Sequence, residues 1–204
     1  MVTGKEVFPD SQRIVALLEG KFGEVSALPE SQAEIAVIGR SNSGKTSLLK
    51  ALLNCPNPPQ VSSRPGSTRL MHLYRLGQAG SASRATLVDF PGYGYAQSSA
   101  VFRQRFSRML LDYLQSGRPV KAICLIMDCR RETAEEEQEI ARIAKERRVP
   151  LLLCLNKCDQ LNQSETAKLK MRYQNAEGYF EIILMSAGKR LNLGYIRNYI
   201  VSVG

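Results

Sequence analysis

The sequence predicts an α/β fold, a three-layer domain in which a mostly parallel sheet has helices on both faces. Short apolar runs alternate with helix-like segments from residue 34 to the end of the chain, which is typical of a parallel sheet covered on both sides. The 204 residues, 44% of them hydrophobic, are enough for one domain with a substantial core. In such a sheet, ligands bind at the carboxyl ends of the strands.

The first part of the chain precedes the predicted sheet. Residues 11–18 have the pattern of a short amphipathic helix, and a loop that holds Pro29 follows them. We therefore expect residues 1–30 to form an N-terminal extension that packs on a domain of residues 31–204.

From residue 34 the predicted elements follow in a regular order. The apolar run at residues 34–38 reads as a buried strand, and residues 47–53 read as the helix after it. Residues 70–76 and 84–88 are expected to be paired strands, because the glycine- and serine-rich segment 77–83 can form the turn between them.

Proline and glycine punctuate the second half of the chain. Gly117 and Pro119 end a predicted helix at Ala100–Gln115, and Pro150 ends a highly charged helix at residues 133–148. Further strands are predicted at residues 122–127, 151–155 and 181–185, and further helices at residues 164–173 and at the C-terminus.

Residues 39–46 (GRSNSGKT) match the phosphate-binding pattern G-x-x-x-x-G-K-[ST] at every fixed position. Gly39 and Gly44 allow the backbone to curl, so that amide N–H groups point at phosphate oxygens. Lys45 would bring its charge to the outer phosphates, and the Thr46 hydroxyl could bind Mg²⁺. The sequence therefore predicts a P-loop NTPase. The predicted contacts of the loop are Gly39, Arg40, Ser41, Asn42, Ser43, Gly44, Lys45 and Thr46.

Residues 89–92 (DFPG) follow a predicted strand and have the D-x-x-G form. Asp89 would hold Mg²⁺ through a water, and the Gly92 amide would contact the terminal phosphate. The polar loop at residues 61–69 could become ordered around the γ-phosphate, with Thr68 as a second magnesium ligand. An ordinary mobile loop, in which Thr68 caps the next strand, is the alternative. Phe90, Pro91, Gly66, Ser67, Arg69 and Leu70 complete this part of the predicted site.

Residues 156–159 (NKCD) predict which base is bound. The Asp159 carboxylate can accept hydrogen bonds from the N1–H and 2-amino groups of guanine, whereas adenine would leave it buried and unpaired. Asn156 would brace the loop, and Lys157 would lie along the base. At the end of the last strand, residues 186–188 (SAG), with Ser186 and Ala187 as the predicted contacts, could supply a backbone N–H to the guanine 6-oxo group. Met185 and Cys158 complete the predicted base site.

The net charge of +9 predicts a polyanionic partner, since a single bound nucleotide does not account for it. Aromatic residues make up only 7% of the chain, which gives no stacking platform for single strands. Structured RNA contacted through its phosphates is therefore favoured over an anionic membrane surface. Solubility alone is the other interpretation of the charge.

The cysteines and the N-terminus bear on the compartment. The five cysteines form no C-x-x-C pair and the only histidine is His72, so a structural zinc site is not expected. Scattered thiols suit a reducing cytosol. Charged residues in the first twenty positions argue against a secretory leader, and no apolar run approaches the ~20 residues of a membrane span. We expect a soluble, cytoplasmic protein.

With these motifs assembled, the chain resembles the EngB (YihA/YsxC) family of bacterial ribosome-assembly GTPases, which belongs to the TrmE-Era-EngA-EngB-like group. The resemblance is carried by residues 39–46, 64–69 (RPGSTR) and 89–96 (DFPGYGYA), where the segment YGYA goes beyond a general D-x-x-G motif. Residues 118–121 (RPVK) and 128–130 (DCR) also fit, as do the two base-recognition motifs. Four positions depart from the family pattern: Ser43, Arg64, Arg69 and Asn156.

The resemblance implies a single Ras-like G domain that binds GTP and GDP with Mg²⁺ and hydrolyses GTP slowly. It also implies a role in late assembly of the large (50S) ribosomal subunit, with rRNA and ribosomal proteins as partners, and a need for the protein in normal cell division and septation. We expect a cytoplasmic monomer. The predicted catalytic residues are Lys45, Thr68 and Gly92, and the predicted metal ligands are Thr46, Thr68 and Asp89.

Hydrolysis lacks one expected component. Tyr93 follows D-x-x-G where a water-orienting glutamine is common, and the sequence shows no arginine finger in cis. We therefore expect slow turnover that accelerates on a ribosomal particle. Asn42 suggests K⁺ as a further cofactor, with structural bracing of the loop as the alternative.

The arginines near the second switch are the first candidates for rRNA contacts, namely Arg103, Arg105 and Arg108, followed by Arg130, Arg131, Arg147 and Arg148. In the charged helix at residues 133–148, glutamates can pair with these cations, and a solvated face is favoured there. The rival to a ribosomal role is a GTP-dependent protein-interaction module for cell division that does not act through the ribosome. A GTPase serving RNA modification is a third reading, but the chain has no room for a second catalytic domain.

Overall fold

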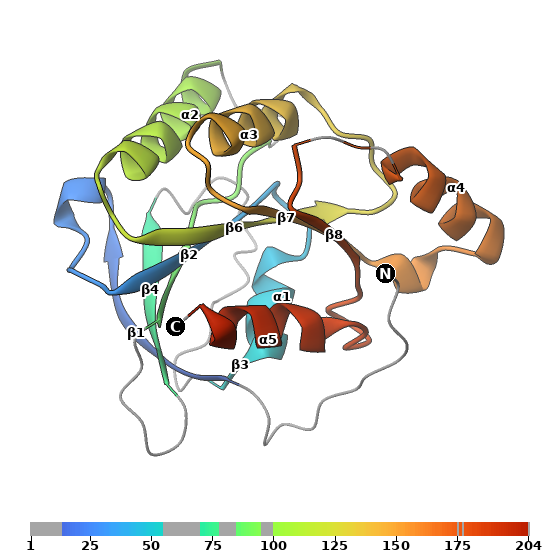
Figure 1. Ribbon diagram of the computed structural model, residues 1–204, viewed down its shortest axis with the longest axis horizontal. Helices are drawn as coiled ribbons and strands as arrows, with labels where there is room; N and C mark the ends of the chain where they lie inside the picture. The colour runs from blue at the N-terminus through green and yellow to red at the C-terminus, as the bar shows by residue number, and fades with distance from the viewer. Residues whose placement is uncertain are drawn as a thin grey trace.

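The computed structural model describes residues 14–54, 70–77, 85–94, 100–174, 176 and 178–203, with the backbone alone for residues 54 and 100–103. Here eight strands form one sheet in the order β3-β1-β4-β5-β2-β6-β7-β8 (Figure 1). The strands are β1 (Ile14–Phe22), β2 (Ala33–Gly39), β3 (Leu53–Asn54), β4 (Met71–Gly77), β5 (Ala85–Asp89), β6 (Val120–Asp128), β7 (Leu151–Asn156) and β8 (Glu181–Leu184). Strands β5, β2, β6, β7 and β8 are parallel, whereas β4 is antiparallel to β5 and β1.

The helices cover both faces of this sheet. They are α1 (Lys45–Leu52), α2 (Ala100–Gln115), α3 (Glu135–Glu146), α4 (Gln163–Tyr173) and α5 (Leu193–Ser202), with short 3₁₀ turns η2 (Val25–Ala27) and η3 (Cys158–Gln160). Helices α1 and α5 lie on one face and α2 and α3 on the other (Figure 1). The predicted α/β fold with a mostly parallel sheet and helices on both faces is confirmed.

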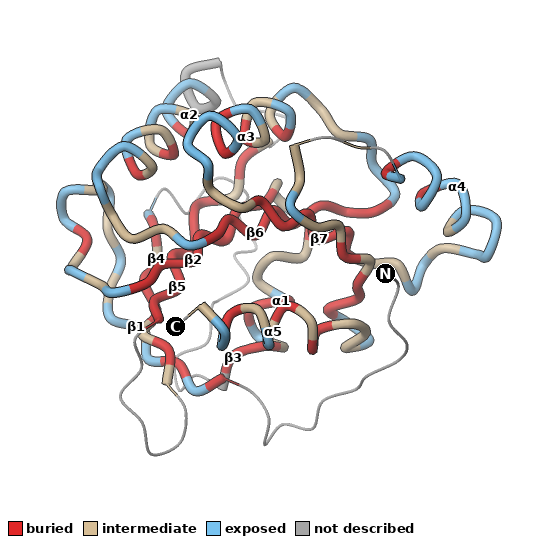
Figure 2. Tube along the Cα trace, in the orientation of Figure 1, coloured by how far each residue is buried: buried red, intermediate tan, exposed pale blue. Residues whose placement is uncertain are grey.

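Alternation along the strands divides the core into two layers. Ile35 and Val37 of β2 pack with α1 and α5, whereas Ala36 and Ile38 pack with α2, α3 and α4. The central strands are therefore buried along their whole length, and the helices are exposed on their outer sides (Figure 2). A run of apolar residues without polar alternation is what a strand buried on both faces requires.

The predicted helix at residues 11–18 is wrong, because Ile14–Phe22 forms β1 between β3 and β4. Its burial alternates with a period of two: Ile14 and Ala16 enter the core, and Val15 and Leu17 stay exposed. Antiparallel pairing with β4, from Val15 to Phe22 with a bulge after Leu18, thus overrides the helical pattern. The predicted domain boundary at residue 30 stays a prediction.

The other predicted elements are confirmed with shifts of a few residues at their ends. Helix α2 has the predicted bounds, and the paired strands β4 and β5 are antiparallel neighbours. The predicted turn between these two strands, after Gly77, lies outside the described residues. Among the described residues, no helix is both long and apolar enough to cross a membrane.

A buried carboxylate, Glu34, links several chain segments at the amino end of β2, the end opposite the P-loop. Glu34 at the start of β2 is 0% exposed and accepts hydrogen bonds from Arg118 Nε (2.9 and 3.0 Å), from Tyr113 Oη (2.7 Å) and from the Ser31 hydroxyl. Arg118 also donates to the carbonyl of Leu28 (3.1 Å). Burial raises the pKa of Glu34, but these hydrogen bonds outweigh it and hold the pKa below its usual value.

Candidate nucleotide-binding site

The P-loop connects the carboxyl end of β2 to the N-terminus of α1. Gly39 ends the strand, and Gly44 precedes the helix with a φ of 92°, in the left-handed region that favours glycine. A Cβ atom at Gly39 would lie 2.7 Å from Ser43 Oγ and 2.9 Å from the Ile126 carbonyl oxygen. The two glycine positions of the motif thus exclude a side chain for steric reasons that the structure makes explicit.

Two consecutive residues at the end of β7, its last residue Asn156 and the following Lys157, hold two consecutive carbonyls of the P-loop. Asn156 Nδ2 donates to Ser43 O at 2.8 Å, and Lys157 Nζ donates to Asn42 O at 2.9 Å. A Cβ atom at Gly44 would lie only 2.1 Å from Asn156 Nδ2. The predicted base-recognition motif and the predicted phosphate loop are therefore in direct contact.

The segment after β8 contacts the end of β7 through its backbone groups. Ala187 N donates to Asn156 Oδ1 at 2.9 Å, and Cys158 N donates to Met185 O at 3.0 Å. Both side-chain atoms of Asn156 are thus satisfied, one by the P-loop and one by the segment after β8. The buried Asn156 side chain thus holds together the P-loop, predicted to bind the phosphates, and the segment after β8, predicted to bind the base.

Asp89 ends β5, and its side chain is only 7% exposed. It forms an ion pair with Lys45 Nζ, and His72 Nδ1 lies 3.8 Å from its other oxygen. Burial lowers the pKa of His72, although Asp89 acts in the opposite direction. Sequence reasoning did not give His72 this position, which follows from its pairing with Asp89 across β4 and β5.

The donors at this point fit a magnesium ion. The Thr46 hydroxyl and the Asp89 carboxylate are hard oxygen ligands of the kind Mg²⁺ prefers, and Asp89 is a buried carboxylate that already faces one cation, Lys45. No group of three or more His, Cys, Asp or Glu side chains that could hold a metal occurs among the described residues. An ion here would therefore rely on waters and on phosphate oxygens as well, as Mg²⁺ usually does.

Tyr93, which follows D-x-x-G, anchors this segment to the P-loop and to α3. It is 1% exposed, and its hydroxyl donates to Glu137 Oε1 at 2.9 Å. Ser41 N donates to Tyr93 O at 2.8 Å, and the ring packs on Phe106 of α2 with centroids 5.0 Å apart. Burial and the Glu137 carboxylate raise the pKa of Tyr93 well above its usual value. The phenol is therefore committed to α3 rather than to a water at the site.

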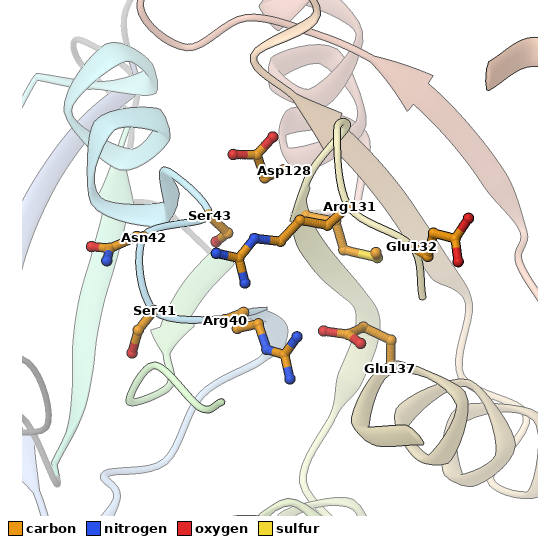
Figure 3. A pocket seen from close by; sticks show the side chains of 9 residues that line it. Arg40, Ser41, Asn42, Ser43, Asp128, Arg131, Glu132 and Glu137 are labelled. Carbon is orange, nitrogen blue, oxygen red and sulfur yellow. The ribbon is translucent and has the colours of Figure 1, made fainter. Parts of the chain in front are cut away.

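A hollow lies beside the P-loop, between the end of β6 and the start of α3 (Figure 3). Arg131 extends across it toward the P-loop, and Ser43 Oγ is buried beside it without a hydrogen-bond partner in the described part of the chain. The sequence predicted the P-loop side of this hollow as part of the site, but not the side that comes from the end of β6 and the start of α3. It is lined by Arg40, Ser41, Asn42, Ser43, Met127, Asp128, Arg131, Glu132 and Glu137.

The predicted site residues that the structure describes, apart from Leu70, lie at or just after the carboxyl ends of β2, β5, β7 and β8, as the rule for ligand sites in such sheets predicts. Leu70 lies just before β4 and is exposed. Arg105 and Arg108 are exposed on α2, and Arg108 pairs with Asp112 at 3.3 Å. The predicted residues outside the described part of the chain are Arg64, Gly66, Ser67, Thr68, Arg69 and the side chain of Arg103.

Comparison with known proteins agrees with this geometry. The sequence model of a family described as "50S ribosome-binding GTPase" matches residues 34–157. "Probable GTP-binding protein EngB" of Desulfovibrio desulfuricans is 36% identical over 166 residues, which cover 81% of this chain and 80% of the relative. The protein of the same name from Lactobacillus helveticus is 33% identical over 186 residues, which cover 86% of this chain and 92% of the relative.

Solved structures share the fold. A crystal structure of a probable GTP-binding protein engB matches with a TM-score of 0.58 and 17% identity, covering 83% of this chain and 97% of that one. A variant of Era of Aquifex aeolicus, bound to GDP and aluminium fluoride, matches with a TM-score of 0.66 and 22% identity, covering 84% of this chain and 57% of that one.

Proposed function

Because the chain belongs to the EngB family of GTP-binding proteins and is a GTPase, we propose that it is a GTP-controlled switch in the assembly of the large (50S) ribosomal subunit. The observation that carries this proposal is the match to a ribosome-binding GTPase family over residues 34–157, the segment that holds the P-loop and D-x-x-G motifs and the first two residues of N-K-x-D. The net charge of +9 supports a partner rich in phosphate. We propose that it acts in the cytoplasm as a monomer and that normal cell division and septation need it.

We propose that the nucleotide is held along the edge formed by the braced P-loop. The amides of the loop and Lys45 would bind the phosphates, and Asp159 with the amide of Ala187 would read the guanine. Because Lys45 pairs with Asp89 in this structure, nucleotide binding would require Lys45 to exchange this carboxylate for a phosphate oxygen. Thr46, Thr68 and Asp89 would hold Mg²⁺, whose charge would offset that of the phosphates.

We propose that hydrolysis is slow until the ribosomal particle completes the site. Lys45, Thr68 and Gly92 would position and stabilise the terminal phosphate. The Tyr93 hydroxyl donates to Glu137, so it would not orient the attacking water. Single-turnover assays with and without 50S precursors test this, and fast hydrolysis by the free protein would contradict it. We further propose that the exposed Asn42 side chain helps to bind K⁺, which replacement of K⁺ by Na⁺ in the same assay would test.

Co-sedimentation with 50S precursors under GTP and under GDP tests the ribosomal role. We expect binding that depends on GTP and that weakens steeply with added salt, because phosphate contacts release counterions. Asp159→Asn should abolish the GTP dependence, whereas the matched change Asp112→Asn on the outer face of α2 should leave it in place. Binding that resists salt and ribonuclease, and that follows cell-division proteins instead of ribosomal particles, would replace the proposal with the protein-interaction module.

A further inference from the structure

Asp128 is a buried carboxylate that none of the nucleotide-binding motifs includes. It is the last residue of β6, is 5% exposed, and lies beside Asn156 in the register of β6 and β7. It stands at the edge of the hollow that the P-loop residues Asn42 and Ser43 also line (Figure 3). A buried charge at this place needs partners, and the partners indicate what it does.

Two cations, Arg130 and Lys157, pair with the Asp128 carboxylate. Arg130 Nε donates to Oδ1 at 2.8 Å and Arg130 Nη2 to Oδ2 at 2.6 Å, while Lys157 Nζ donates to Oδ2 at 2.9 Å. Hydrogen bonds from Arg130, and then from Lys157, hold the pKa of Asp128 well below its usual range against the effect of burial. Asp128 is therefore ionised at neutral pH, and Lys157 faces a negative charge at this point.

The same ammonium of Lys157 also donates to Asn42 O at 2.9 Å. It thus links a fixed carboxylate at the end of β6 to a carbonyl of the P-loop. A lysine has a long, flexible stem whose conformational entropy opposes any single position, and the side chain is 27% exposed. Without Asp128, the ammonium would have water as an alternative partner, and its hold on Asn42 would weaken.

The position of these carbonyls fixes the direction of the amides beside them. A peptide unit is planar and trans, so holding the Ser43 carbonyl outward, as Asn156 does, points the Gly44 N–H the opposite way. Lys157 fixes the adjacent peptide through Asn42 O in the same manner. Asn42 has a positive φ of 66°, which is uncommon for a residue with a side chain, so contacts from outside the loop help to hold this backbone shape.

We propose that Asp128 is a positioning residue of the nucleotide site: it fixes Lys157 against Asn42 O and so keeps the P-loop shaped for phosphate before the nucleotide arrives. Asp128 does not touch the nucleotide and acts only through Lys157. The inference rests on the proposed nucleotide site, since it assumes that phosphate binds at this loop. Removal of the carboxylate should therefore weaken GDP and GTP alike and leave the preference for guanine over adenine, set by Asp159, unchanged.

The test is a double-mutant cycle on the release of mant-GDP, measured by stopped-flow fluorescence with excess unlabelled GDP. Asp128→Asn should speed release about tenfold, the effect of one charge-assisted hydrogen bond. In a Lys157→Met background, the same change should alter the rate by less than about twofold, because no ammonium remains to position. Asp112→Asn, an exposed carboxylate on α2, is the matched control and should release mant-GDP at the unaltered rate.

Distinct outcomes separate the inference from the site it rests on. If the unaltered protein does not bind mant-GDP, the proposed site is wrong and the inference falls with it. If it binds, and Asp128→Asn either has no effect or has the same effect with and without Lys157, the positioning role is overturned. Circular dichroism checks folding. If Asp128→Asn does not fold, Asp128→Glu replaces it. Asp128→Glu should then increase the rate of mant-GDP release by less than about tenfold, and only in the protein that keeps Lys157. An equal increase with Lys157 and with Lys157→Met would overturn the positioning role.

Discussion

Replacement of Arg118 by methionine should destabilise the fold most at neutral pH. Arg118 is the cation of the buried carboxylate Glu34, whose side chain is 0% exposed, and it also donates to the carbonyl of Leu28. Methionine keeps the apolar stem and removes the charge. Loss of one partner of a buried ion pair costs about 3–5 kcal/mol. The uncompensated carboxyl can take up a proton instead, which at pH 7 costs about 3.7 kcal/mol for a group with a pKa of about 4.3. We therefore expect a loss of about 3–4 kcal/mol.

The sign of the pH dependence distinguishes this cause from a simple packing defect. In the unaltered protein the pKa of Glu34 is lowered on folding, so its contribution is present above the unfolded pKa and is lost as the pH falls through the folded one. In the variant, burial without Arg118 should raise the folded pKa above the unfolded one. The free energy of unfolding of the variant should then be highest at low pH and should decrease as the pH rises through the raised folded pKa of Glu34. The difference between the two proteins should thus be larger at about pH 7.5 than at about pH 5.

Urea unfolding followed by circular dichroism at these two pH values measures the effect. Arg142→Met is the matched control, because Arg142 pairs with Glu139 and Glu146 on the exposed face of α3. Its loss should be a small fraction of that for Arg118, since exposed ion pairs contribute little. A destabilisation of Arg118→Met that equals the control, or that is the same at both pH values, would refute the reasoning.

Two further changes test the site. Tyr93→Phe should reduce the free energy of unfolding by about 1.5–3 kcal/mol, because it removes a buried hydrogen bond to Glu137. The rate of GTP hydrolysis by the free variant should stay within about twofold of that of the unaltered protein. A large loss of hydrolysis would instead give the phenol a catalytic role. Gly44→Ala should abolish binding of mant-GDP in a folded protein, because its Cβ would meet Asn156 Nδ2 at 2.1 Å. Gly117→Ala is its control: it also has a positive φ, of 74°, but nothing within 4 Å, so it should bind normally. Binding by both alanine variants would show that the close approach to Asn156 is unimportant.

The sequence was sufficient wherever the determining interactions are local. The P-loop could be predicted because the residues that form its turn, its strand and its helix are contiguous. The assembly of the segments after β2, β5, β7 and β8 could be predicted as well, since parallel strands all end at one edge. These inferences need only the order of elements and a motif at each end.

What could not be predicted depends on partners far along the chain. The run from Ile14 to Leu18 is apolar throughout, so its period of two is hidden, and only the pairing with β4 makes it a strand. Asp128 acts through Lys157 on Asn42, and no spacing in the sequence relates these three positions. Two signals were available: Asp128, like Asp89, stands at the end of an apolar run where ligand-site residues collect, and residues 128–130 fit the family pattern.

Strand β1 limits how far the chain can be truncated from its N-terminus. It lies between β3 and β4 and occupies the hydrogen-bonding groups along one side of each. A truncation that begins at residue 31 would leave β4 with an open row of N–H and C=O groups, the kind of edge on which other chains assemble. Such a fragment would keep every nucleotide-binding motif and yet tend to precipitate, so the early residues of this protein are protection against aggregation as much as part of its architecture.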